Sequence, residues 1–138
     1  MSYAIGPFGA WLAAGSLKFL INSLCAKRLA FGLIGNGGLP SNHSAIVSCT
    51  AALIALKEGV SHPAFAVALT LAFIVMLDAA SLRKEVGKHA AAINAMSSES
   101  ASATRLRERM GHTLVEIAAG LAVGILVAVG LFKLSCCG

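Results

Sequence analysis

Charged residues are scarce in this chain. Asp, Glu, Lys and Arg together make up 12% of its 138 residues, and 57% of the residues are hydrophobic. Soluble domains carry about 25% charged residues, so the composition excludes an ordinary soluble domain and predicts a small membrane protein with one domain, residues 1–138. The net charge is +5, yet we expect no nucleic-acid partner, because the chain is apolar and its aromatic residues are not interleaved with basic ones. An anionic lipid or a phosphorylated substrate fits this charge better.

Several sequence signatures are also missing. The cysteines, at 25, 49, 136 and 137, have no zinc-type spacing, and the chain has no Walker loop and no dinucleotide fingerprint. We therefore expect no metal site and no cofactor. No basic residue precedes Lys18, and the first apolar segment is too long for a cleavable signal peptide.

Four apolar segments predict an all-α integral membrane protein with four transmembrane helices. A helix needs about 20 apolar residues to cross the hydrocarbon core, and the second segment is short for this purpose. It crosses only where the bilayer thins or neighbouring helices shield it. Ser61 or His62 can cap the third helix, and Pro63 suits its first turn. The expected spans are 5–25, 41–57, 63–80 and 112–134.

A polar loop, residues 81–111, separates the third and fourth spans. Val86, Ala90 and Ile93 repeat at helical spacing, so we expect the third helix to continue past the membrane to about Ala95. Residues 104–110 are expected to form a basic helical lead-in to the fourth span. The polar loop is therefore predicted to be a helical hairpin.

Four crossings would bring the ionisable residues to one membrane face. The end of the first span, the start of the second, the end of the third and the start of the fourth all lie there. This face carries eight of the eleven basic residues, namely Lys27, Arg28, Arg83, Lys84, Lys88, Arg105, Arg107 and Arg109. The positive-inside rule predicts that the face is cytoplasmic and that both termini lie on the opposite side.

Two histidines stand at the edges of apolar segments on this face. Glu116 follows His112 at i+4, on the same side of a helix, where its carboxylate can orient the imidazole. With His43 as a second imidazole to exchange protons, this pair suits phosphoryl transfer through a histidine. The simpler interpretation is a helix-start histidine paired with an interfacial glutamate, and a second histidine at a loop–helix junction.

Both histidines belong to longer spaced motifs. The motifs are Gly37-Gly38-x-Pro40-Ser41-x-His43-Ser44-Ala45, Asp78-Ala79 with Arg83, Gly87, Ala90 and Asn94, and Leu106-Arg107-Glu108 before Gly111-His112-x3-Glu116 and Gly120. Together they resemble the divergent branch of the type 2 phosphatidic acid phosphatase superfamily, small membrane proteins related to acid phosphatases and vanadium haloperoxidases. The resemblance runs from about Lys18 to Gly124. The sequence departs from the wider superfamily in having Leu106 where an arginine precedes the last histidine, with Arg105 and Arg107 on either side.

The resemblance implies a metal-independent phosphatase that acts on a membrane lipid phosphate through a phosphohistidine. His112 would be the nucleophile, and Glu116 would hold its other ring nitrogen. His43 would protonate the leaving alkoxide and then activate water. Vanadate, which mimics five-coordinate phosphorus, should inhibit this reaction.

Cations and small residues near the histidines are the expected phosphate ligands. The basic ones have alternatives, since a lysine inside a span can snorkel and an arginine can serve only membrane topology. Asp78 would orient a cation, bind a divalent ion or, most simply, form a structural ion pair, and Asn94 would help to line the cytoplasmic mouth. The expected ligands are Lys18, Ser41, Gly38, Arg83 and Arg107.

Three functions stay open from the residues alone. The first is the lipid phosphate phosphohydrolase, and the second is a non-enzymatic protein that binds or transports an anion through a degenerate site. The third is a structural assembly subunit, which would depend on Gly120 and Gly124, a small-xxx-small pair suited to close helix packing. The same pair is one contact face on which a homo-oligomer could form.

Overall fold

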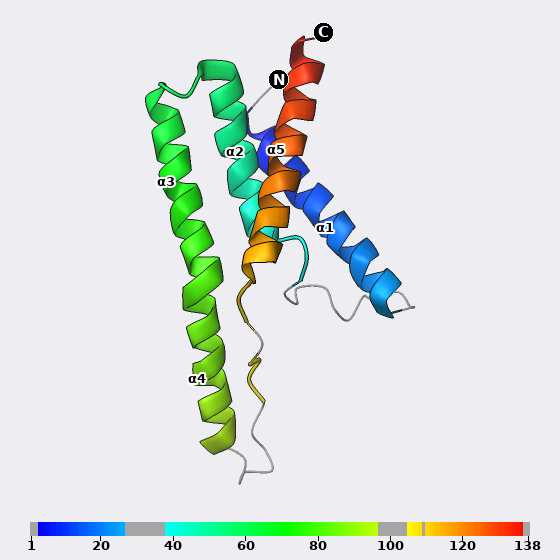
Figure 1. Cartoon of the computed structure of the whole chain (residues 1–138), viewed down its shortest axis with the longest axis vertical. Helices are drawn as coiled ribbons and strands as arrows, with labels where there is room; N and C mark the ends of the chain where they lie inside the picture. The colour runs from blue at the N-terminus through cyan, green and yellow to red at the C-terminus, as the bar shows by residue number, and fades with distance from the viewer. Residues whose placement is uncertain (1–2, 27–37, 97–104, 109, 137–138) are drawn as a thin grey trace.

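The computed structural model describes residues 3–26, 38–96, 105–108 and 110–136, and every regular element in these ranges is helical (Figure 1). The all-α class is thereby confirmed. Lys27, Arg28, Gly37 and Arg109 lie outside the described residues. The elements are α1 (Ile5–Ala26), α2 (Asn42–Glu58), α3 (Pro63–Leu77), the π-helical turn η2 (Asp78–Leu82), α4 (Arg83–Met96) and α5 (Leu114–Cys136).

Three helical stretches are long and apolar enough to cross a membrane: Ile5–Cys25, Pro63–Met96 and Leu114–Cys136. The second of these joins α3, η2 and α4 into 34 continuous residues. At 1.5 Å per residue it is about 51 Å long, well beyond a hydrocarbon core of about 30 Å. The expected extension of the third helix past the apolar segment is confirmed. His62 also caps α3 as expected, since its Nδ1 accepts a hydrogen bond from the Ala64 N–H.

Helix α2 is central and packs against α1, α3 and α5 (Figure 1). It has 17 residues and is not among the three long apolar stretches. The core at its crossing with α1 and α5 is built mainly from small side chains, which let helix backbones approach closely. Its buried residues are Ala10, Ala14, Ala45, Cys49, Leu53 and Ala128.

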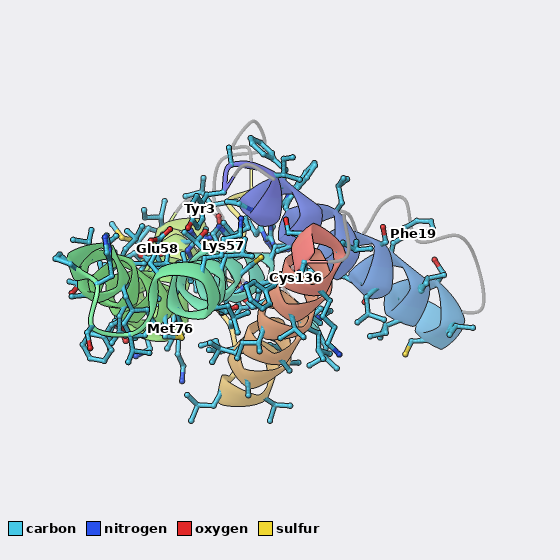
Figure 2. All side chains as sticks on the ribbon, turned by 90° about the horizontal axis from the view of Figure 1, so that it is seen from above. Tyr3, Phe19, Lys57, Glu58, Met76 and Cys136 are labelled. Carbon is cyan, nitrogen blue, oxygen red and sulfur yellow. The ribbon has the colours of Figure 1, made fainter. Side chains whose placement is uncertain are left out.

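The end of α2 far from His43 is tied to the N-terminal end of α1. The Tyr3 hydroxyl donates a hydrogen bond to the Glu58 carboxylate, and the Lys57 ammonium lies 4.6 Å from the centre of the Tyr3 ring. Figure 2 shows these three side chains together, seen from above. From this anchor α1 runs obliquely away from the other helices toward its C-terminal end (Figure 1).

A helical lead-in to α5 is expected over residues 104–110. This prediction is wrong for the residues of that range that are described, 105–108 and 110. Residues 105–108 and 110–113, named here the return segment, are not helical and run back beside α4 (Figure 1). The backbone N–H and C=O of Leu106 bond to the Asn94 side chain, so groups that a helix would pair are satisfied by another element. Within the described part of the predicted hairpin, only its first arm, α4, is helical.

The small-xxx-small pair of α5 packs against α2 of the same chain. A Cβ on Gly120 would overlap the Ser41 carbonyl oxygen, and a Cβ on Gly124 would overlap the Ala45 carbonyl oxygen and the Ser48 hydroxyl. This face was expected to be a possible contact between chains. Helix α2 occupies it instead, which brings the first turn of α2 against the first turns of α5.

Gly124→Ala is expected to destabilise the protein by about 1–3 kcal/mol, because the added methyl group overlaps α2 backbone and the helices must separate. Gly130→Ala is the matched control, since a Cβ there meets nothing within 4 Å. The control should be neutral or stabilise by up to about 1 kcal/mol through helix propensity. Thermal unfolding of both variants in detergent measures the difference, and equal melting temperatures would contradict the packing described.

Candidate functional site

His112 and Glu116 form a hydrogen-bonded pair at the start of α5. His112 Nδ1 lies 3.0 Å from Glu116 Oε2, and the two side chains are 8% and 19% exposed. A carboxylate oxygen accepts, so the imidazole carries a proton on Nδ1, and in the neutral ring Nε2 then presents a lone pair. This is the arrangement in which a carboxylate fixes the tautomer of a reactive histidine.

The same carboxylate caps α5. Glu116 Oε2 accepts from the Thr113 N–H at 3.0 Å, and the Thr113 hydroxyl accepts from the Glu116 N–H at 3.3 Å. These reciprocal bonds form a capping box, with Thr113 as N-cap and Glu116 three residues later. The capping box at the start of α5 therefore fixes the position of the Glu116 carboxylate independently of its hydrogen bond to His112.

The backbone of His112 is held by the long helix that α3, η2 and α4 form together. Its N–H donates to the Ala79 carbonyl oxygen in η2 at 2.9 Å. Gly111, with φ of 92°, precedes it in a backbone conformation that glycine adopts readily. A Cβ on Gly111 would lie 3.2 Å from the Lys84 nitrogen and 3.4 Å from the Ala79 oxygen, so glycine also permits this close approach.

The π-helical turn η2 aligns Asp78 with Arg83. Residues five apart on an α-helix point about 140° away from each other, but the wider turn, in which the Arg83 N–H donates to the Asp78 carbonyl, brings them together. Arg83 Nε donates to Asp78 Oδ2 at 2.8 Å. Asp78 thus orients an arginine, one of the roles expected for it.

Arg83 connects this ion pair to the second histidine. Its Nη2 lies 3.4 Å from His43 Nε2. A guanidinium can only donate, so His43 Nε2 is the acceptor and the ring proton is on Nδ1. The rings of His43 and His112 are 6.4 Å apart between centroids and tilted by 56°. The structure therefore brings both predicted histidines and Arg83 into one cluster.

The start of α2 is fastened to the start of α5. The Ser41 N–H donates to the Glu116 carbonyl oxygen at 2.9 Å. Ser41 is fully buried, and its hydroxyl oxygen caps α2 by accepting from the Ser44 N–H and hydroxyl. Two neighbouring buried atoms, Asn42 Oδ1 and His43 Nδ1, have no hydrogen-bond partner among the residues that the structure describes. Such atoms are uncommon in folded proteins and call for an explanation.

One side of α1 faces this cluster. Lys18 is half-buried, and its ammonium interacts electrostatically with Glu116 and with His43. One turn to either side, a Cβ on Gly15 would lie 3.9 Å from Asn42 Nδ2, and Asn22 Oδ1 lies 3.7 Å from where a Cβ of Gly38 would be. Lys18 is thus placed with the histidines, as expected.

The remaining expected site residues, Gly38, Arg107 and Asn94, lie in different parts of the structure. Gly38, with φ of 136°, directly precedes the turn into α2. Arg107 is exposed on the return segment. Asn94 bonds to the return segment near the end of α4 and not to the histidine cluster. Phosphate binding stays a prediction for the whole expected set, Lys18, Ser41, Gly38, Arg83 and Arg107.

Two contributors were missed from the sequence. The capping role of Thr113 could have been found, because Thr113-x-x-Glu116 before an apolar run is a capping-box pattern. The Ala79 carbonyl had no such signal, since a backbone group acquires its role only from the π-helical turn and the return segment beside it.

The chain has recognisable relatives. A family model described as the Divergent PAP2 family matches residues 3–127, which confirms the resemblance drawn from the spaced motifs. A curated relative, the "Uncharacterized membrane protein YuiD" of Bacillus subtilis (strain 168), is 28% identical over 144 residues, which cover 92% of this chain and 91% of the relative. This relative supports the assignment of the chain as a membrane protein. No solved structure matches the chain.

Thr113→Ala is expected to lower the stability by about 1 kcal/mol, because it removes the hydroxyl that accepts from the first turn of α5. Thr113→Ser keeps that hydroxyl and should retain most of the stability. Thermal unfolding of the two variants in detergent is the measurement. An equal loss in both would show that the methyl group, and not the capping bond, matters at this position.

Proposed function

The chain belongs to the Divergent PAP2 family, and we propose that it is a metal-independent membrane phosphohydrolase that removes phosphate from a lipid phosphate. The observation that carries this proposal is the cluster in which the His112–Glu116 pair lies 6.4 Å, between ring centroids, from His43, itself in contact with Arg83. The cluster combines a nucleophile, an acid–base group and an anion ligand, which are the requirements of phosphoryl transfer through a histidine.

In the first step, His112 Nε2 attacks phosphorus and the bond to the lipid oxygen breaks. The Nδ1 proton stays bonded to Glu116, whose carboxylate stabilises the positive charge that develops on the ring. The low exposure of His112, 8%, supports this role, because little water competes for the reactive ring. The products are a phosphohistidine and a lipid alcohol.

His43 supplies the proton that the lipid oxygen takes up and then removes one from the attacking water. Water displaces the phosphoryl group from His112, which releases inorganic phosphate. In the structure His43 Nε2 accepts from Arg83 and carries no proton. It can donate only after Arg83 leaves that nitrogen and Nε2 takes up a proton, which the acidic hydroxyl of a phosphate monoanion or a water molecule can supply. A bound phosphate dianion would attract the guanidinium more strongly than a neutral imidazole does, so substrate binding would itself release His43.

Arg83 is the arginine that we assign to the phosphate. Position 106, where the wider superfamily carries an arginine, is Leu here. Arg83 lies beside His43 and is oriented by Asp78, whereas Arg107 is exposed on the return segment. With Lys18 from α1, Arg83 would offset the charge on the transferring phosphoryl group.

We further propose that α2 is a fourth membrane crossing, shielded by the three helices around it, so that the chain crosses with spans near those expected. At 17 residues it is about 25 Å long, close to the thickness of a thinned hydrocarbon core. The histidine cluster then lies at the cytoplasmic interface, where a lipid keeps its phosphate in water and its chains in the bilayer. Both termini lie on the opposite side.

The test is phosphate release by the purified protein in detergent from a panel of lipid phosphates, with His112→Ala and His43→Ala measured beside it. The protein should release phosphate from at least one lipid, vanadate should block the release, and each variant should lose at least about 100-fold in kcat. No release from any lipid by a folded protein that still binds phosphate would overturn the enzyme and favour the anion-binding alternative.

Arg83→Gln is expected to weaken vanadate binding by about 10-fold or more, because it removes the charged donor beside His43. Arg107→Gln removes the same charge from an exposed position and should change the affinity by less than about threefold. Inhibition constants, or isothermal titration with vanadate, separate the two variants. A larger effect at Arg107 would reassign the phosphate ligand to the return segment.

A further inference from the structure

The side chain of Asn94, near the end of α4, forms three hydrogen bonds with the return segment. Its Nδ2 donates to the Leu106 carbonyl and to Glu108 Oε1, each at 2.8 Å, and its Oδ1 accepts from the Leu106 N–H at 2.8 Å. Both amide hydrogens and one acceptor position are therefore used. Little hydrogen-bonding capacity is left for a substrate.

Further contacts continue along α4 toward the histidine. A Cβ on Gly87 would overlap the Glu108 carbonyl oxygen and lie 3.5 Å from the Met110 nitrogen, so only glycine lets the segment lie this close. Gly111 then approaches Lys84, and the His112 N–H reaches the Ala79 carbonyl. The return segment is thus docked from Asn94 back to η2, in antiparallel order.

Asn94 lies too far from the histidines to touch a phosphate bound between them. Asn94 lies fifteen helical positions after Ala79, which corresponds to about 22 Å along the axis. His112 is nevertheless part of the return segment, two residues before the first residue of α5, and its main chain is held by Ala79. A shift of the segment along α4 would therefore move the imidazole relative to His43.

We propose that Asn94 is a positioning residue for His112: it anchors the return segment to α4 and thereby sets where the nucleophilic ring lies. This inference rests on the proposed function for its catalytic consequence, though not for its structural one. The role is distinct from lining the mouth of the site, because the carboxamide is turned to the return segment and acts through it.

The test compares Asn94→Ala with Asn94→Gln in the purified full-length protein. Alanine removes all three bonds, and glutamine keeps the same groups one methylene further out. His89→Ala, an exposed position on α4, is the control.

Asn94→Ala should lower kcat for lipid phosphate by about 10- to 100-fold, because small misplacements of a reacting group are costly. KM should stay within about twofold, since the cationic ligands of the phosphate are untouched. Glutamine should recover part of kcat.

Hydrogen exchange gives a readout that a local role would not change. In Asn94→Ala the amides of both Leu106 and His112 should exchange about 10-fold faster, while those in the middle of α5 stay protected. Faster exchange at Leu106 with His112 unchanged would overturn the proposal, as would a higher KM with the same kcat. Should the alanine variant unfold, Leu106→Pro removes the N–H that donates to Asn94 Oδ1. Since proline has no amide hydrogen, this variant is judged by kcat and by exchange at the His112 amide, which should be about 10-fold faster.

The two proposals fail differently. If the wild-type protein releases no phosphate from any lipid, the proposed function is wrong, and exchange at the His112 amide still decides whether Asn94 positions it. If the wild-type protein is active and Asn94→Ala matches it in kcat and in exchange at His112, the enzyme stands and the positioning role is wrong.

Discussion

The close approach of α2 and α5 is the contact on which the histidine cluster depends. Gly120 and Gly124 leave room for the α2 backbone where any side chain would overlap it. At this separation the Ser41 N–H reaches the Glu116 carbonyl oxygen, which sets the start of α2 against the first turn of α5. His43 follows Ser41 by two residues and His112 precedes Glu116 by four. The close packing of α2 on the two glycines of α5, together with this backbone hydrogen bond, thus places His43 near His112 although the two are far apart in the sequence.

The second constraint is electrostatic. A carboxylate and a guanidinium at the end of an apolar helix are costly unless they are paired, and regular α-helical geometry would point Asp78 and Arg83 apart. The π-helical turn resolves this conflict, because it aligns the two side chains and also places the Ala79 carbonyl where the His112 N–H can reach it. A single irregular turn therefore orients Arg83, the arginine proposed to bind phosphate, and holds the main chain of the proposed nucleophile.

The candidate site draws side chains from helices spread along the described residues, although the chain is short. Helix α1 contributes Lys18, α2 contributes His43, the long helix contributes Arg83, and the start of α5 contributes the His112–Glu116 pair. The apolar remainder of these helices exposes large side chains suited to lipid. Such a distribution suits a substrate whose charged group meets the cluster while its chains stay in the bilayer.

The sequence by itself determined the features that are local. Hydrophobic runs predicted the helices, and His62 with Pro63 predicted the start of α3. The repeat from Val86 to Ile93 predicted the length of α4, and the i+4 spacing predicted the pairing of His112 with Glu116. Each of these features depends on residues within a few positions of one another. Only the tertiary structure decided the rest. The described part of the return segment is not helical, and Asn94, twelve residues before Leu106, bonds the Leu106 N–H and C=O that a helix would pair. Gly120 and Gly124 meet α2 of their own chain, and Arg83 meets His43, because helices distant in sequence pack together, which spacing along one helix cannot predict.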